Sequence, residues 1–172
     1  LTFDAEQITQ VLLFDFTKNG QQLIETQGRY AGCIPLNQDD QIHVQITMTD
    51  TGEYQDDFIV EGFQIIGLDV VSQPNVTENE LYLSPFKQDS ATVNLQEGWV
   101  PVEKIHDEET GATLYRTYLD SGFLLPVVAE KGFWKVSGFL SVRVIGRQGT
   151  EVLSIPRVFS FDPEVVSGGR RP

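Results

Sequence analysis

The side chains best suited to chemistry in this sequence gather in two short acidic stretches. One holds Asp107, Glu108 and Glu109, and the other supplies four carboxylates: Asp50, Glu53, Asp56 and Asp57. Carboxylates at strand ends can provide the oxygen ligands that Ca²⁺ takes, roughly six to eight of them. Neither stretch has the alternating acidic positions and the glycine of an EF-hand loop. Solvated surface loops are the simpler interpretation, and residues 50–57 are the candidate calcium site.

The triplet Asp50-Thr51-Gly52 also follows a strand-like apolar run, and there it resembles the catalytic loop of aspartic proteases. The segment at 65–69, Ile-Ile-Gly-Leu-Asp, is similar to a later segment of the retroviral-type members of that family. In those enzymes two carboxylates share one proton across a symmetry axis. This chain has no second Asp-Thr-Gly or Asp-Ser-Gly, and Glu53 stands where the family has a small residue. Because Asp-Thr-Gly is also a favourable turn sequence, we predict a turn at 50–52 and no enzymatic activity.

Two aromatic residues, Trp99 and Tyr115, are the candidate ligand-binding residues. Exposed aromatic rings on a β-sandwich can stack against a sugar, as they do in carbohydrate-binding modules. Trp134 lies in register with the apolar residues of its segment, so we expect it in the core. The sequence predicts no cofactor, since it has neither a Walker loop nor a Gly-x-Gly-x-x-Gly motif.

The cysteine and histidine residues of this chain give little support to catalysis. Cys33, the only cysteine, rules out a disulfide within the chain and a cysteine-based zinc site. We expect it to be a small buried residue. His43 and His106 are far apart in the sequence, and no Gly-x-Ser-x-Gly elbow accompanies them. We predict that both histidines lie at the surface.

The charge of the chain limits its partners. Twenty-five acidic residues against twelve basic ones give a formal charge of −13. A negative field of this size repels nucleic-acid phosphates and anionic lipids. No apolar run reaches the ~20 residues of a membrane-spanning helix, and no basic segment leads into an apolar one. We therefore expect a soluble, acidic protein that neither binds nucleic acid nor inserts into a membrane; the compartment stays undetermined.

An alternation of apolar and polar residues runs along most of the chain. At residues 42–48 and again at 134–144, apolar side chains recur at every second position. Such a pattern is typical of strands with one buried and one solvated face. It predicts an all-β fold, namely an antiparallel β-sandwich of Greek-key, immunoglobulin-like or jelly-roll type, with a closed barrel as the alternative. Strands are expected at 8–16, 21–30, 42–49, 58–71, 81–86, 91–95, 99–105, 112–119, 123–129, 132–145 and 151–161, and a helical turn at 1–9.

Glycine, asparagine and proline mark the expected turns and irregularities. Asn19-Gly20 predicts a tight hairpin, because both residues tolerate positive φ. Gly62 and Gly67 predict bulges or a bend within the strand at 58–71. A second hairpin turn is expected at 146–149. Pro126 and Pro156 predict strands at sheet edges, where a missing N–H does no harm.

These patterns predict one β-sandwich domain at residues 1–166 and a flexible tail at 167–172. With no catalytic motif in place, we expect a non-enzymatic structural or protein-interaction domain that binds a protein partner or self-associates. The alternative is an accessory module that binds a carbohydrate, with or without calcium.

Overall fold

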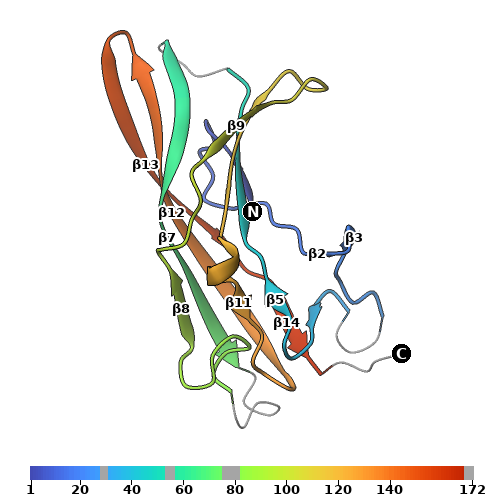
Figure 1. Cartoon of the computed structure of the whole chain (residues 1–172). Helices are drawn as coiled ribbons and strands as arrows, with labels where there is room; N and C mark the ends of the chain where they lie inside the picture. The colour runs from blue at the N-terminus through green and yellow to red at the C-terminus, as the bar shows by residue number, and fades with distance from the viewer. Residues whose placement is uncertain (28–30, 53–56, 75–81, 169–172) are drawn as a thin grey trace.

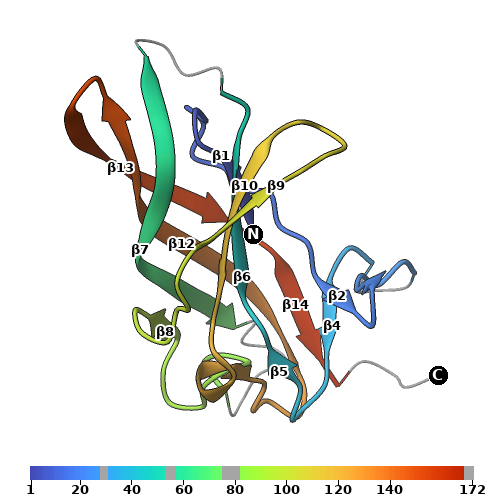
Figure 2. The ribbon, with the colours of Figure 1, turned by 45° about the horizontal axis from the view of Figure 1, so that its top comes forward.

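Two β-sheets packed face to face form the body of this chain in the computed structural model (Figures 1 and 2). The structure describes residues 1–27, 31–52, 57–74 and 82–168. The predicted all-β sandwich is confirmed. Within these ranges the sheets do not close into a barrel, and the helical structure is a single 3₁₀ turn, η1 (Ser121–Phe123).

The larger sheet, called sheet B, is built around two strands of seventeen residues, β7 (Phe58–Pro74) and β12 (Gly132–Gln148). They pair antiparallel along almost their whole length. The strand β8 (Thr92–Leu95) flanks β7. On the other side of β12 lie β13 (Glu151–Phe161) along one part and β14 (Glu164–Ser167) along another, with β4 (Ile34–Leu36) beyond β14.

The smaller sheet, sheet A, overlies one part of sheet B (Figure 2). Its strand order is β1 (Thr2–Asp4), β6 (Gln45–Asp50), β10 (Thr113–Tyr118) and β9 (Glu103–His106). Two further pairs are short: β2 (Thr17–Lys18) with β3 (Gln21–Gln22), and β5 (Gln41–Ile42) with β11 (Leu125–Pro126). Most neighbouring strands are antiparallel, but β1–β6 and β4–β14 are parallel, so both sheets are mixed.

The alternation predicted at 134–144 sets the orientation of β12. Its inward residues are buried, and all are at most 3 % exposed: Trp134, Val136, Leu140, Val142 and Val144. The residues between them, such as Lys135 and Arg143, face solvent. Trp134 is thus a core residue, as predicted. Because side chains alternate between faces, a one-residue slip of β12 would expose this whole row.

The bulges predicted at Gly62 and Gly67 are present in β7. Opposite the continuous strand β12, the register skips Glu61 and Ile66, each of which lies next to one of these glycines. Each bulge adds one residue to β7 and bends it. The predicted segment 58–71 is therefore a single bent strand.

Aromatic contacts join the two sheets. The Phe3 ring of β1 packs edge-on against Phe63, with centroids 5.5 Å apart, and lies 4.7 Å from the Phe159 ring of β13. The Tyr115 hydroxyl of β10 donates a hydrogen bond of 2.8 Å to the Val60 carbonyl oxygen. Because the inner faces of both sheets meet in these contacts, sheet A packs closely on this part of sheet B.

The segment 10–13 joins the edges of the two sheets. Leu12 N donates to the Ser160 carbonyl oxygen of β13 at 2.8 Å, and Thr2 N donates to the Leu13 carbonyl oxygen at 2.8 Å. The prediction of a regular strand at 8–16 is wrong, since only isolated bridges form there. The alternation itself persists: Leu12 is buried, whereas Val11 and Leu13 are exposed. On each side the segment forms an isolated bridge to a different sheet, and it forms no continuous ladder with either.

The Asn19-Gly20 hairpin is confirmed, with φ of 54° and 77° at its two central residues. The returning strand, predicted at 21–30, ends at Gln22. The prediction is therefore wrong for residues 23–27, and residues 28–30 lie outside the described residues. The hairpin between β12 and β13 turns at Gly149-Thr150, and residues 146–148 still belong to β12. Pro156 lies where β13 pairs with β12 and, among described strands, with no other.

Other boundaries also differ from the predictions. The helical turn expected at 1–9 is wrong, because β1 occupies this segment. Residues 82–86 form no strand, and residue 81 is not described. Of 99–105 and 123–129, only 103–105 and 125–126 are strand. Ser167, predicted to open the tail, is buried at the end of β14, and its hydroxyl donates to the Ala129 carbonyl oxygen at 2.7 Å.

Gly138 is the gap in the apolar row of β12, and the Phe161 ring fills the space above it. A Cβ at this position would lie 2.0 Å from the ring. We expect Gly138→Ala to lower the free energy of unfolding by about 1–3 kcal/mol, because overpacking forces the ring out of its place. Urea denaturation measures the change.

Gly67→Ala is the matched control for this prediction. Gly67 is also a strand glycine without positive φ, and its Cβ would meet only the movable Gln96 side chain, at 3.4 Å. Equal losses of stability in the two variants would contradict the role of the Phe161 ring.

Candidate functional site

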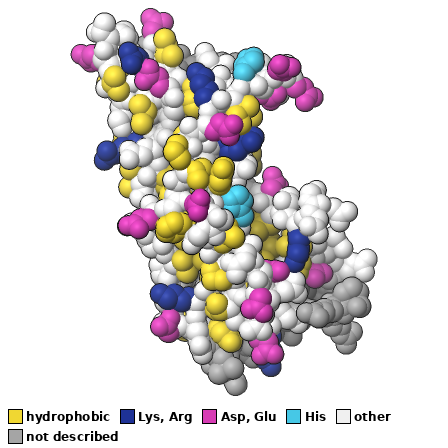
Figure 3. Space-filling model, in the orientation of Figure 1, with side chains coloured by type: hydrophobic (Ala, Val, Ile, Leu, Met, Phe, Trp, Pro, Cys, Tyr) yellow, Lys and Arg dark blue, Asp and Glu magenta, His cyan; other side chains and the backbone are white. Residues whose placement is uncertain are grey.

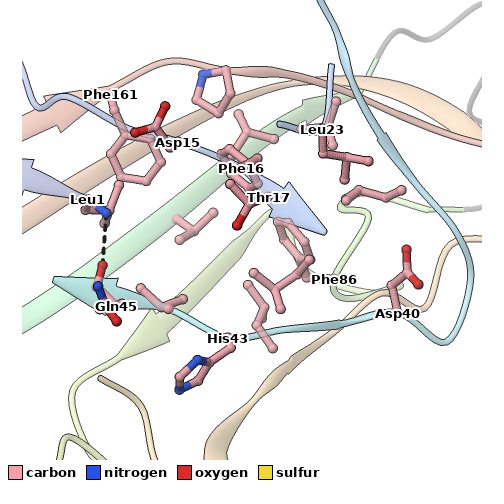
Figure 4. A pocket seen from close by; sticks show the side chains of 18 of the residues that line it. Leu1, Asp15, Phe16, Thr17, Leu23, Asp40, His43, Gln45, Phe86 and Phe161 are labelled. Carbon is pink, nitrogen blue, oxygen red and sulfur yellow. Dashed lines mark hydrogen bonds between the residues drawn. The ribbon is translucent and has the colours of Figure 1, made fainter. Parts of the chain in front are cut away.

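A cavity of about 540 Å³ lies between the sheets, next to the region where Phe3 and Tyr115 hold them in close contact (Figure 4). Its floor belongs to the inner face of sheet B and is apolar. The apolar residues that line it and are almost fully buried are Leu36, Leu68, Val70, Phe86, Leu125, Val136, Phe161 and Val165. This volume is within the ~300–1,000 Å³ range of small-molecule sites.

The wall facing sheet B is formed by the chain between β5 and β6. His43 and Gln45, at the start of β6, lie on this wall, and Asp15, Phe16 and Thr17 lie across the opening (Figure 4). The His43 Nε2–H donates to the Leu119 carbonyl oxygen at 3.0 Å, and the imidazole packs edge-on against Tyr118. This ring nitrogen is thus occupied by a structural hydrogen bond. The Leu1 amino group likewise donates to the Gln45 carbonyl oxygen, at 2.9 Å.

An ion pair crosses the mouth of the cavity. Lys18 Nζ lies 2.9 Å from Asp40 Oδ1, and Asn37 N donates to Asp40 Oδ2 at 2.9 Å. Partial burial would raise the pKa of Asp40, but the hydrogen bonds from Asn37 and Lys18 outweigh it, and the pKa is lowered. The pair ties the β2–β3 hairpin to the loop that precedes β5, which holds the hairpin over the opening.

Phe86 closes one side of the cavity and is held by local hydrogen bonds. Its backbone N–H donates to Ser84 Oγ at 3.2 Å, and Ser84 Oγ lies 3.0 Å from Ser72 Oγ of β7. Val128 N donates to the Pro85 carbonyl oxygen at 2.8 Å. These bonds hold an irregular loop against sheet B. The Phe86 ring is therefore positioned by β7 and by the segment after β11.

A second feature is the outer face of sheet B, which is unusually apolar. Besides polar residues, β7, β12 and β13 present large side chains that are between 37 % and 69 % exposed: Ile59, Ile66, Val71, Phe139, Val152 and Val158. Arg143 and Arg147 lie among them on β12, and Arg147 pairs with Glu61. Figure 3 shows hydrophobic side chains both at the protein surface and at the bottom of a hollow.

The two predicted ligand-binding aromatics do not form a surface platform. Tyr115 is 1 % exposed, and its hydroxyl bonds to Val60 inside the sandwich. Trp99 is partly buried against the core, and its indole N–H donates to the Leu95 carbonyl oxygen at 3.1 Å. The alternation placed Tyr115 on a strand, but only the packing of sheet A shows that its face is the inner one.

The candidate calcium residues are described only in part, because Glu53 and Asp56 lie outside the described residues. Asp50 ends β6, and its Oδ1 accepts a hydrogen bond from Gly52 N at 2.9 Å. With a φ of 76° at Gly52, this is the turn predicted for Asp-Thr-Gly. Asp57 starts the chain into β7 with a φ of 55°. Among the residues that the structure covers, no three acidic, histidine or cysteine side chains group as metal ligands.

The second acidic stretch is organised by its own side chains. Asp107 Oδ1 accepts from Glu109 N at 3.0 Å, and Asp107 Oδ2 accepts from the Thr110 hydroxyl at 2.6 Å. These hydrogen bonds, that from Thr110 first, lower the pKa of Asp107. The loop is therefore an exposed turn stabilised by its carboxylate.

Cys33 is buried, as predicted. Burial and the nearby Glu164 carboxylate raise the pKa of its thiol, so little reactive thiolate forms at neutral pH.

The cavity was not predicted from the sequence. Its floor residue Val136 was expected only as part of the buried row at 134–144, Phe161 only as the end of a strand, and Lys18 was not singled out. The Asn19-Gly20 turn is the one sequence signal near the mouth. The ion pair of Lys18 with Asp40 joins residues twenty-two positions apart, which no local pattern reveals.

The chain matches no family model, and comparisons with curated proteins and with solved structures find no similar protein. The described residues include no helix that is long and apolar enough to cross a membrane.

Two valines of β12 provide a test of the cavity. Val136 lines it, whereas Val142 is buried in close packing and does not. We expect Val136→Phe to leave the free energy of unfolding unchanged or to raise it by up to about 2 kcal/mol, as cavity-filling changes do. Val142→Phe should lower it by about 1–3 kcal/mol through overpacking. Thermal and urea unfolding measure both; an equal loss in the two variants would contradict an open cavity.

The ion pair at the mouth predicts a pH-dependent contribution to stability. The folded pKa of Asp40 lies below its ordinary 3.8, so its contribution is present above 3.8 and is lost as the pH falls through the lowered value. Lys18 is half exposed, so Lys18→Gln should cost no more than ~1 kcal/mol at neutral pH. The cost should vanish once Asp40 is protonated.

Lys87→Gln, at an exposed position that does not line the cavity, is the control for this experiment. Urea denaturation at neutral pH and at a pH well below 3.8 gives the comparison. A cost of Lys18→Gln that stays the same at both pH values would show that the lysine acts through packing and not through Asp40.

Proposed function

We propose that this chain is a non-enzymatic protein-interaction domain and that its binding surface is the outer face of sheet B. The observation that carries the proposal is the row of exposed apolar side chains from Ile59 and Val152 at one end to Val71 at the other. An outward face of a solvated sheet is normally polar. A contiguous exposed apolar patch on a folded protein usually marks an interaction site.

The size of the patch indicates a weak complex. The area of sheet that holds its exposed apolar positions extends over roughly ten residues of β12 and across three strands, about 33 Å by 14 Å, or about 460 Å² in projection. This area includes the polar residues of the face, so the apolar patch itself is smaller. Patches of ~300–600 Å² are the largest found on typical monomers and are often functional. Stable complexes bury ~800 Å² on each partner. A transient or concentration-dependent association therefore fits this face better than an obligate one.

The charges on this face point to the kind of partner. Lys135, Arg143 and Arg147 lie on it with Glu61, Asp69 and Glu164, the last opposite Lys135, and Asp69 accepts a hydrogen bond from Asn94. The face is thus balanced in charge, whereas the whole chain carries a charge of −13. Two copies that meet through this face would therefore bring no excess of like charge together, and the apolar face of a second copy complements it. Self-association is therefore the form of the proposal that we test.

Substitutions on the outer face should weaken self-association. The variant is Phe139→Ser with Val158→Ser, which removes two exposed apolar groups from adjacent strands. We expect the average mass of the wild-type protein to rise above 19.3 kDa as its concentration increases. The double variant should remain at the monomer mass. Light scattering behind a sizing column, combined with sedimentation velocity over a concentration series, measures this.

Ile8→Ser is the matched control, because Ile8 is 95 % exposed and belongs to no strand of sheet B. If this variant lowers the average mass as much as the double variant does, the contact is not specific to the face. A wild-type mass that stays monomeric at every concentration would refute self-association.

A further inference from the structure

We propose that the cavity between the sheets binds an uncharged, mainly apolar small molecule, with at most a hydroxyl-type polar end at its mouth. This site is separate from the outer face of sheet B, because its floor belongs to the opposite face of the same strands. On β12, Val136 faces the cavity, whereas Phe139 faces solvent.

The volume and lining determine the apolar part of the ligand. About 540 Å³ is far more than one or a few waters need, since a water occupies about 30 Å³. The floor residues offer no polar side-chain atoms, and waters placed there would lack partners. An apolar ligand gains by leaving water at ~25 cal/mol for each Å² buried, so the floor favours a hydrocarbon chain or ring.

The charges at the mouth favour a neutral end over an anionic one. The Lys18 ammonium is paired with Asp40. The His43 Nε2–H is bonded to the Leu119 carbonyl oxygen. A ligand carboxylate would lie close to the carboxylates of Asp15 and Asp40, which offset the charge of Lys18, and would enter against the negative field of the chain. A neutral hydroxyl needs no counter-ion and finds acceptors on the same rim.

The opening lets such a ligand enter. The β2–β3 hairpin covers one side of the mouth and is attached there by the half-exposed Lys18–Asp40 pair. Its strands are two residues each and are themselves exposed. A cover with so few buried contacts opens at small cost, so a ligand reaches the floor without disturbing the paired strands β7 and β12.

The test uses the neutral probe N-phenyl-1-naphthylamine, which fluoresces in apolar surroundings. We expect saturable binding to the wild-type protein and at least a ~10-fold loss of affinity, about 1.4 kcal/mol, in Val136→Phe. Val70→Phe, which fills the same floor from β7, is the second variant should Val136→Phe fail to fold. Phe139→Ser, on the outer face, should bind the probe as the wild type does.

Competition between matched chains tests the class of ligand. Dodecanol should displace the probe at a concentration at least ~10-fold below that needed with dodecanoate, both kept below aggregation. Equal displacement by the two would overturn the preference for a neutral end. If probe binding is lost in Phe139→Ser but retained in Val136→Phe and Val70→Phe, the probe binds the outer face. This result would overturn the cavity site and leave the proposed interaction surface in place. No saturable binding overturns the proposal outright.

Discussion

The long pairing of β7 with β12 is the constraint on which the rest of this structure depends. Both strands have seventeen residues, and β8, β13 and β14 all attach to one or the other. The strict alternation of β12 determines which of its faces is buried. The two bulges let β7 bend while it stays paired with β12. Sheet A then packs on this frame through Phe3 and Tyr115. A one-residue slip of β12 would reverse both faces at once.

The cavity follows from a difference in length between the sheets. Sheet A is made of strands with three to six residues and covers only part of sheet B. Where it is absent, the short pair β5–β11 and irregular segments around Phe16 and Phe86 cover the inner face of sheet B. Loops cannot fill space as regularly as a second sheet, because their backbone polar groups must also be satisfied. Here Ser84 and Asp40 accept hydrogen bonds from backbone N–H groups of these loops. The space between the loops and the floor remains open.

The same frame explains why the outer face of sheet B is available for binding. The described part of the chain places its loops against the inner face and at the strand ends, so nothing covers Phe139 or Val158 from outside. A ligand in the cavity and a protein on the outer face would contact opposite sides of the same strands. The two sites share β7 and β12 without sharing side chains, which makes them separable by substitution.

The sequence by itself determined the all-β class, the two faces of β12, the bulges beside Gly62 and Gly67, the Asn19-Gly20 hairpin and the turn at Asp50. Each is a local property: a period of two, or a residue whose backbone preferences fit one conformation. Tertiary structure alone decided which strands pair apart from the two hairpins, that segment 10–13 joins both sheets, that β14 exists and that Tyr115 points inward. It also decided the cavity, whose walls come from segments far apart in the chain. An alternating pattern says that one face is buried but not what covers it, and that depends on contacts between distant residues.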